Sequence, residues 1–287
     1  MQKYMILYNP KAGNGRGKEN ALAIRKILPE CNLTFRDMTQ VSNYRKFFEE
    51  LPRDTGIVIC GGDGTLNRFL NDTIGLPLQD DLFYYPCGSG NDFQRDVAQN
   101  GSSKLIQLKD YMENLPLVTV NGKTYRFLNG IGYGIDGYCC QVGDQLRESS
   151  DPKVNYTAIA IKGLLFHYKP TNAVVTVDGQ KHTYKKVWLA PTMNGRYYGG
   201  GMMPTPAQNR KNTDGTVSAM VMYGAGKLKT LAVFPSIFKG EHVRHEEMVD
   251  VLTGHTIRVE FDRPTPLQID GETIPNVTSY EVTGGAQ

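Results

Sequence analysis

The chain has few cysteines, and their spacing suggests no cross-link. Its 287 residues include five cysteines, an odd number without any CxxC pair, and Cys139 and Cys140 are adjacent. These features argue against a disulfide framework and against a cysteine-based zinc site. They favour a reducing compartment, and we expect a cytoplasmic protein.

Long hydrophobic runs are also missing. No apolar stretch approaches the roughly 20 residues that are needed to cross a bilayer, so we expect no transmembrane segment. The opening residues, with the apolar run YMILY at 4–8, are typical of a β-strand and not of a signal peptide. Both observations agree with a cytoplasmic location.

An excess of one charge is absent as well. The chain has 32 Lys and Arg against 29 Asp and Glu, a net charge of +3, which is too small to indicate a nucleic-acid partner. It is compatible with contacts to phosphates or to an anionic membrane surface. The five histidines form no metal-binding pattern. His242 and His245 lie three apart without a third ligand, and we expect both on the surface.

The first third of the chain alternates strand-like and helix-like segments. Strands are predicted at residues 4–8, 56–60 and 82–85, and helices at 18–28, from 42 onward, at 66–72 and at 92–98. Strands that alternate with helices indicate a doubly wound, mostly parallel sheet. We therefore expect an α/β domain at residues 1–118.

From about residue 118 onward, closely spaced strands dominate. They are predicted at 117–120, 124–128, 173–177, 187–190, 217–223, 256–261 and 266–269, with helices at 154–168 and 228–239. Turn pairs such as Asn121-Gly122 and Asp178-Gly179 separate several of the strands. This pattern favours an antiparallel β-sandwich at residues 119–287.

The stretch ICGGDGTL at residues 59–66 lies where a predicted strand meets a predicted helix. Ligands of open α/β sheets bind at this carboxyl edge. Glycines let backbone N–H groups approach a phosphate, and the helix offers its positive N-terminus. Asp63 would repel phosphate unless a divalent cation or a hydrogen-bond network neutralises it. A tight turn with a solvent-facing aspartate is the simpler alternative.

Two more loops of small residues follow other predicted strands. NPKAG at 9–13 follows the first strand, and PCGSGNDF at 86–93 follows a later one. Parallel strands end at one edge of a sheet, so we expect the three loops to meet and to bind a polyphosphate. The sequence GYGIDG at 132–137 also fits GxGxxG. It lies outside any βαβ unit, however, and we do not expect it to bind a dinucleotide.

Together these motifs resemble those of the diacylglycerol kinase catalytic family, in particular its soluble bacterial lipid kinases, to which sphingosine and ceramide kinases are related. GGDGT at 61–65 is similar to the central family motif, NPKAG to its NPxxG loop, and residues 86–92 to PxGTGND, with Ser89 in place of the usual threonine. In the second half the likeness continues with Asn194, GGG at 199–201, Pro204, Ala207, Asp214-Gly215 and DGE at 270–272.

This resemblance implies a two-domain enzyme with ATP in the cleft between the domains. Its γ-phosphoryl group would pass to a lipid hydroxyl, most simply that of diacylglycerol, giving phosphatidic acid. The implied nucleotide contacts are Asn9, Pro10, Lys11, Ala12, Gly13, Thr39, Gly62, Asp63, Gly64, Thr65, Leu66, Asn67, Ser89 and Asp92. A structural Mg²⁺ is implied at Asp214, with the carbonyls of Lys211 and Thr216 on either side.

The implied catalytic residues are Asp270 and Glu272, with Asp63 beside the phosphates. Phosphoryl transfer requires positioning and charge neutralisation, which Lys11 or Arg16 and a Mg²⁺ ion near Asp63 and Asp92 could supply. The acceptor hydroxyl needs a base, and the sequence leaves open whether this is Asp270 or Glu272. On local pattern alone, Asp270-Gly271 is more simply a hairpin turn.

A lipid acceptor implies transient, peripheral contact with a membrane surface, and the resemblance also suggests a homodimer. The run KGLLFHY at 162–168 is amphipathic and is expected to pack in the core, with membrane contact as the alternative. Two other functions stay open: a kinase of a soluble acceptor, as in NAD kinase, and a catalytically silent nucleotide-binding regulator. The presence of Asp63, Asp92, Asp270 and Glu272 argues against the silent regulator.

Overall fold

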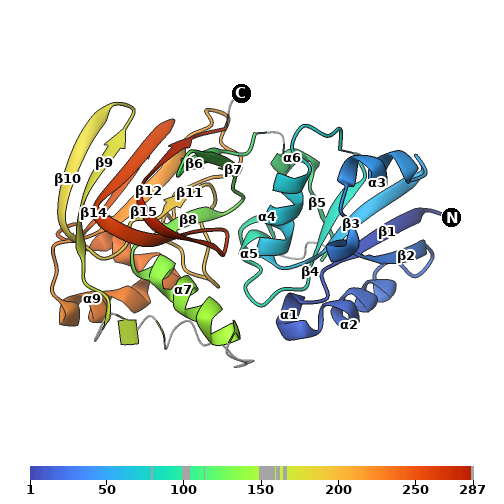
Figure 1. The fold of residues 1–287 in the computed structure, drawn as a ribbon, viewed down its shortest axis with the longest axis horizontal. Helices are drawn as coiled ribbons and strands as arrows, with labels where there is room; N and C mark the ends of the chain where they lie inside the picture. The colour runs from blue at the N-terminus through green and yellow to red at the C-terminus, as the bar shows by residue number, and fades with distance from the viewer. Residues whose placement is uncertain are drawn as a thin grey trace. The chain divides into compact units, whose positions relative to one another are not determined.

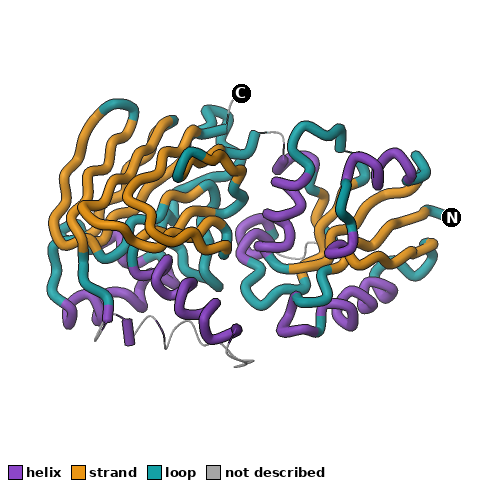
Figure 2. Tube along the Cα trace, in the orientation of Figure 1, coloured by secondary structure: helices purple, strands orange, loops and turns teal. Residues whose placement is uncertain are grey.

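A computed structural model describes residues 1–78, 80–98, 104–112, 114–148, 159, 162–163 and 167–285. The chain divides into two compact units, Met1–Glu113 and Asn114–Gln287, which Figures 1 and 2 show as a ribbon and as a tube. The strand that spans the expected division at residue 118 is β6 (Leu117–Val120), and all of it belongs to the second unit.

The first unit is built on a five-stranded sheet in the order β2-β1-β3-β4-β5. Its strands are β1 (Lys3–Tyr8), β2 (Asn32–Asp37), β3 (Thr55–Gly61), β4 (Leu82–Pro86) and β5 (Ile106–Gln107). The first four pair in parallel and β5 is antiparallel, which confirms the mostly parallel sheet. The sequence did not predict β2, whose residues alternate between exposed and half-buried.

Helices cover both faces of this sheet. They are α1 (Ala12–Gly15), α2 (Gly17–Leu22), η1 (Ala23–Lys26), η2 (Met38–Gln40), α3 (Tyr44–Glu50), α4 (Asp63–Asp72), α5 (Asp92–Val97) and α6 (Lys109–Met112). On one face, α2 and η1 bury Ala21 and Ile24 against the sheet. On the other face lie α3 and α4 (Figure 1). Tyr44 of α3 meets Phe69 of α4 edge to face, with ring centroids 5.3 Å apart. All of β3 is buried between these layers.

The second unit is an antiparallel β-sandwich, as predicted. Its strands are β6, β7 (Lys123–Arg126), β8 (Gly130–Tyr133), β9 (Thr171–Val177), β10 (Gln180–Val187), β11 (Thr192–Met193), β12 (Val217–Met222), β13 (Val249–Gly254), β14 (Thr256–Ile269) and β15 (Glu272–Thr283). Their main path runs β13-β12-β11-β8-β14-β15-β6-β7. Tyr133 of β8 stacks on Phe261 of β14 at 3.8 Å between ring centroids, inside a core of valine, isoleucine and tyrosine.

In the described part of the second unit, the helices include α7 (Ile135–Glu148), α9 (Lys227–Val233), η4 (Phe234–Lys239) and η5 (Glu241–Arg244). The sequence predicted the stretch of α9 and η4 but not α7. The helix predicted at 154–168 lies mostly outside the described residues. No described helix is both long and apolar enough to cross a membrane.

The surface location expected for His242 is wrong. This side chain is fully buried and its Nε2 lies 2.9 Å from the Pro204 carbonyl oxygen. Burial lowers its pKa, because a charged imidazole loses its hydration in the core. The histidine therefore packs as a neutral core residue.

Candidate active site

The carboxyl edge of the first sheet gathers the loops that the sequence singled out. The chain leaves β1 at Asn9, β3 at Gly62 and β4 at Cys87, and these three strands are neighbours in the sheet. β2 ends at the same edge, where Thr39 donates from its backbone and its hydroxyl to Asp37 Oδ1 at 2.9 and 2.7 Å. Four chain segments that are far apart in sequence thus end at one edge.

Asn9 ties the first loop to helix α4. Its Nδ2 donates to Thr65 Oγ1 at 2.9 Å, and its Oδ1 accepts the Lys11 N–H at 3.0 Å. Gly13 has a φ of 56°, and a Cβ built on it would lie 2.8 Å from the Cys87 carbonyl oxygen. The first loop therefore lies against the loop that follows β4, and only glycine fits at this contact.

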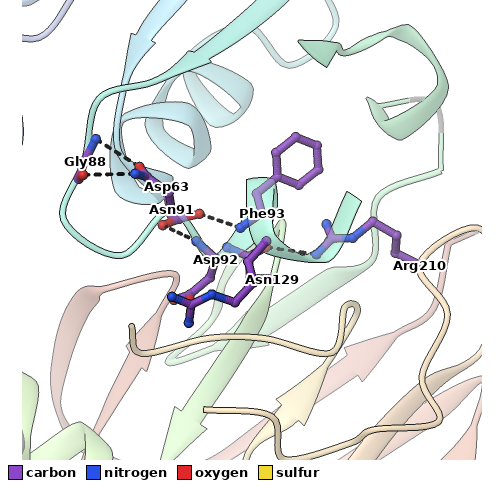
Figure 3. A network of polar contacts seen from close by, with 8 residues as sticks. Asp63, Gly88, Asn91, Asp92, Phe93, Asn129 and Arg210 are labelled. Carbon is purple, nitrogen blue, oxygen red and sulfur yellow. Dashed lines mark hydrogen bonds and ion pairs between the residues drawn. The ribbon is translucent and has the colours of Figure 1, made fainter. Parts of the chain in front are cut away.

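Gly62 and Gly88 bring the two other loops into direct backbone contact. A Cβ on Gly62 would stand 3.1 Å from the Gly88 Cα, and a Cβ on Gly88 would overlap the Gly62 Cα. Asn91 holds the second loop in shape, because its Oδ1 accepts the Gly88 N–H at 2.9 Å and its Nδ2 donates to the Gly88 oxygen at 3.0 Å (Figure 3). The sequence motif contained Asn91, but its role depends on this loop conformation.

Asp63 caps helix α5. Its Oδ2 accepts the Asp92 N–H at 3.0 Å and its Oδ1 accepts the Phe93 N–H at 2.8 Å (Figure 3). Amides of a first helical turn lack partners within the helix, and a carboxylate there also suits the helix dipole. Asp63 therefore joins the loop after β3 to the loop after β4. This arrangement matches the hydrogen-bond network that was one explanation for an acid in the glycine-rich loop.

The side chains at this edge differ in what they can offer a ligand. Lys11 and Ser89 are exposed. Leu66 is fully buried and Asn67 is 5 % exposed, so these two could meet a ligand only through their backbone. Arg16, one of the two predicted phosphate-binding cations, donates from its Nε to Glu19 at 2.9 Å, which leaves Lys11 as the better placed cation.

Tyr84 supports the loop after β3 from within the core. Its hydroxyl donates to the Gly61 carbonyl oxygen at 3.0 Å. Burial raises the pKa of Tyr84 well above its usual value, so the hydroxyl keeps its proton at any physiological pH. The sequence did not single out this residue, because a tyrosine in a buried strand has no local signature.

In the second unit, Asp270 and Gly271 form the two-residue turn between β14 and β15. Both have positive φ, 46° and 95°, as this hairpin turn requires. The Asp270 carboxylate accepts three backbone N–H groups of the segment before β8, from Leu128 at 2.5 Å, Asn129 at 2.8 Å and Gly130 at 3.0 Å. Asp270 is 8 % exposed, so its carboxylate anchors the hairpin tip.

Glu272 has the opposite surroundings. It is exposed at the start of β15, and its side chain makes no hydrogen bond or ion pair with any residue that the structure describes. A carboxylate can accept a proton only where a lone pair is accessible. Of the two acids in the DGE motif, Glu272 is therefore the one with free acceptor capacity.

Arg210 and Asn194 stabilise the segment that holds Asp270. Arg210 donates to the Leu128 oxygen at 3.1 Å and to Asn129 Oδ1 at 3.0 Å (Figure 3). Asn194 Nδ2 donates to the same Leu128 oxygen at 3.0 Å. Sequence reasoning missed Arg210, although its neighbours lie in a recognised motif.

The residues expected to hold a structural magnesium have hydrogen-bond partners within the chain. Asp214 Oδ1 accepts the Thr216 N–H at 3.1 Å and the Thr216 hydroxyl at 3.0 Å, and these bonds lower its pKa. The Thr216 carbonyl already accepts amides from Gln208 at 3.0 Å and Asn212 at 2.8 Å. Among the described residues, no group of three or more His, Cys, Asp or Glu side chains could hold a metal. The magnesium site at Lys211, Asp214 and Thr216 stays a prediction.

The substitution Asp270→Asn tests the anchoring role of this carboxylate. Its amide NH₂ would face a backbone donor, and the orphaned buried group should lower the free energy of unfolding by about 1–3 kcal/mol. Chemical denaturation followed by circular dichroism measures this change. An unchanged midpoint and slope would show that the three hydrogen bonds do not hold the hairpin.

Comparison with known proteins matches each unit to a known domain family. Residues 3–118 match the diacylglycerol kinase catalytic domain, and residues 129–285 match the YegS C-terminal NAD kinase beta sandwich-like domain. A diacylglycerol kinase of Mycobacterium tuberculosis (strain CDC 1551 / Oshkosh) is 26 % identical over 217 residues, covering 71 % of this chain and 66 % of the relative, just under two thirds.

Two other relatives cover nearly the whole chain. A diacylglycerol kinase of Bacillus subtilis (strain 168) is 20 % identical over 285 residues, 95 % of this chain and 90 % of the relative. The crystal structure of a diacylglycerol kinase from Bacillus anthracis str. Sterne has the same fold, with a TM-score of 0.60 at 21 % identity over 99 % of this chain and 94 % of the other. The chain belongs to the family with a YegS C-terminal NAD kinase beta sandwich-like domain, and its first unit carries a diacylglycerol kinase catalytic domain.

Proposed function

We propose that the protein is an ATP-dependent lipid kinase that transfers the γ-phosphoryl group to a lipid hydroxyl, most simply that of diacylglycerol. The observation that carries this proposal is the meeting of four chain segments at the carboxyl edge of the first sheet, two of them in glycine-to-glycine contact. Backbone N–H groups of glycine-rich loops at a helix N-terminus can bind the oxygens of a polyphosphate.

The first unit binds the nucleotide in this proposal. Backbone amides in the first turn of α4, together with the Lys11 ammonium, contact the phosphates, and Ser89 and Thr39 contact the same ligand. A divalent cation that accompanies ATP is held mainly by the phosphates and by one or two carboxylates. Asp63 and Asp92 are two carboxylates at this edge that could hold the ion, which would neutralise phosphate charge there.

The second unit supplies the base. Glu272 takes the proton from the acceptor hydroxyl while the hydroxyl oxygen forms a bond to the γ-phosphorus. The bond between the γ-phosphorus and the β-γ bridging oxygen breaks, and ADP leaves. Asp270 keeps the hairpin tip in place and does not itself accept the proton. This division follows from the exposure of Glu272 and the three donors on Asp270.

A lipid acceptor has to be reached at a membrane surface, so the proposal includes transient peripheral contact with a bilayer. No described surface identifies the docking face, and a homodimer stays a prediction. The rival reading is a kinase of a soluble acceptor of the NAD-kinase type, which would use the same glycine-rich loop but would need no bilayer.

An assay with γ-labelled ATP separates these acceptors. The purified protein is incubated with Mg²⁺ and vesicles that contain diacylglycerol, ceramide or a sphingoid base, and in parallel with NAD⁺. We expect label in a chloroform-extractable lipid phosphate. Label in NADP⁺ alone would favour the soluble-acceptor kinase. Absence of transfer to every acceptor, with ATP still bound, would favour the silent regulator.

A further inference from the structure

The side chain of Gln268 contacts the turn between β14 and β15, which carries Asp270 and precedes Glu272. Gln268 is on β14 two residues before Asp270, is 3 % exposed, and its Oε1 accepts the Gly271 N–H at 2.6 Å. Gly271 lies between the anchored Asp270 and the exposed Glu272. A change at Gln268 would therefore act on the turn that directs Glu272.

The orientation of the Gln268 amide is fixed by chemistry. A backbone N–H can only donate, so the atom that faces Gly271 must be the oxygen, and the Nε2 must point the other way. On that side it approaches Gly132. A Cβ built on Gly132 would lie 2.5 Å from Gln268 Nε2 and would overlap Asp136 Oδ2. The amide nitrogen and the Asp136 carboxylate thus share the space that glycine leaves open at position 132.

Asp136 is a buried acid in the first turn of α7, 7 % exposed. Its Oδ1 accepts the Gly137 N–H at 2.9 Å. Its Oδ2 has no hydrogen-bond donor within bonding distance among the described residues. Burial raises the pKa of Asp136 to about 6, while the nearby Tyr198 hydroxyl and Gln268 amide act in the opposite direction.

Among the described residues, the titratable groups that act on Asp136 are neutral. They are Cys139, Tyr168, Tyr198 and Tyr280. Burial raises the pKa of the Cys139 thiol to about 12 and raises the pKa of each of the three tyrosines. The Tyr198 hydroxyl and the Gln268 amide are therefore the two polar side-chain groups toward which the carboxylate can turn.

Helix α7 contacts this hairpin at two further points. A Cβ on Gly137 would overlap the Pro266 carbonyl oxygen of β14, and Thr273 Oγ1 of β15 donates to Asp144 Oδ2 of α7 at 2.8 Å. The helix is thus packed against both strands of the hairpin. This explains why the GYGIDG sequence carries glycines although no dinucleotide site is needed to account for them.

We propose that Gln268 is a positioning residue for phosphoryl transfer: its carbonyl fixes the Gly271 N–H, and Asp136 orients the Gln268 amide, so that Glu272 is held in a productive geometry. The inference rests on the proposed function for its catalytic consequence. Its structural part, the Gln268–Gly271 hydrogen bond and the role of Asp136, is measurable without activity.

The first test is Gln268→Met, which keeps the length of the side chain and removes the acceptor. We expect kcat to fall between about 10- and 100-fold, because a small misplacement of a reacting group has this effect, while KM for ATP stays within about threefold. The control is Gln180→Met at an exposed glutamine of β10, which should leave kcat unchanged. A Gln268→Met enzyme with wild-type kcat would overturn the proposal.

The second test exchanges the carboxyl group of residue 136 and the amide group of residue 268. Gln268→Glu alone keeps an acceptor for Gly271 but sets a second carboxyl group beside Asp136, so like charges oppose each other. Its kcat, relative to wild type, should rise as the pH is lowered from 8 to 6, because one carboxyl group then takes up a proton. The double variant Asp136→Asn with Gln268→Glu should recover activity at pH 8. Failure of this rescue would contradict the proposed pairing.

Amide hydrogen exchange separates this inference from the proposed function. In the wild-type protein the Gly271 N–H should be protected, and in Gln268→Met its exchange should accelerate at least about tenfold while the core of β14 is unchanged. An inactive wild-type protein with this exchange pattern would refute the kinase assignment and leave the structural part supported. Equal Gly271 exchange in both proteins would refute the inference even in an active enzyme.

Discussion

The variant Glu272→Gln is expected to lose phosphoryl transfer almost completely while folding normally. General base catalysis contributes about 10²–10⁴-fold, so kcat should fall by a factor in this range. Glutamine preserves the size and the hydrogen-bonding reach of the side chain but cannot take up a proton. Because Glu272 is exposed and makes no described polar contact, its replacement should change the free energy of unfolding by less than about 0.5 kcal/mol.

The matched control lies on the same strand. Glu281→Gln removes an exposed carboxylate of β15 that is 3.5 Å from Arg258, an ion pair of a kind that contributes about 0–1 kcal/mol. It should retain full activity. Initial rates at saturating ATP and lipid measure both variants. The opposite result would be a wild-type kcat for Glu272→Gln together with a loss of kcat for Asp270→Asn after correction for unfolded protein. In that case Asp270, and not Glu272, would be the base.

Gly88→Ala is expected to weaken nucleotide binding by separating two loops. A Cβ at this position would overlap the Gly62 Cα and would stand 2.9 Å from Asn91 Oδ1. The first of these neighbours is backbone, which cannot rotate away, so the loops after β3 and β4 must move apart. Such overpacking costs about 1–3 kcal/mol of stability. Because displacement of about 1 Å can cost about 10²-fold in function, we expect ATP affinity to fall at least tenfold.

The control for this substitution is Gly226→Ala in the second unit. A Cβ there meets nothing within 4 Å, and Gly226 has ordinary extended backbone with φ of −78°. Its ATP affinity should match that of the wild type. Fluorescent-nucleotide titration of the three proteins gives the comparison, and a Gly88→Ala protein that binds ATP normally would remove the loop contact from the account.

Most of the first unit follows from sequence because its strands are buried and its turns are marked by glycine and proline. β3, with every residue buried, gives a continuous apolar run that predicts a strand directly. β2 gives no such signal, because an edge strand with no fully buried residue needs few apolar side chains. Because β2 was not predicted, the sequence did not explain why Thr39, which follows β2, lies at the same edge as the glycine-rich loops.

Helix α7 shows how tertiary packing can override local preference. Gly137 and Gly143 lie within it, and glycine weakens an isolated helix by about 1 kcal/mol at each position. At position 137 the close approach of Pro266 requires glycine, a constraint that exists only once β14 is in place. The residues 132–137 were therefore recognised as unusual without their role being predictable.

The candidate site shows the same division. The motifs located the loops and the DGE turn, and the turn reading of Asp270-Gly271 agrees with the structure. The choice between Asp270 and Glu272 could not be made from sequence, because it depends on three N–H groups more than 100 residues away in the chain. The capping of α5 by Asp63 depends in the same way on residues 29 and 30 positions downstream.

The central claim is that the loops of the first unit bind the nucleotide while Glu272 acts only in the chemical step. Calorimetric titration of ATP and Mg²⁺ into Glu272→Gln tests it most directly. The account predicts a Kd within about threefold of the wild-type value alongside the loss of turnover. A Kd weakened in proportion to kcat would contradict it, because Glu272 would then belong to the nucleotide site.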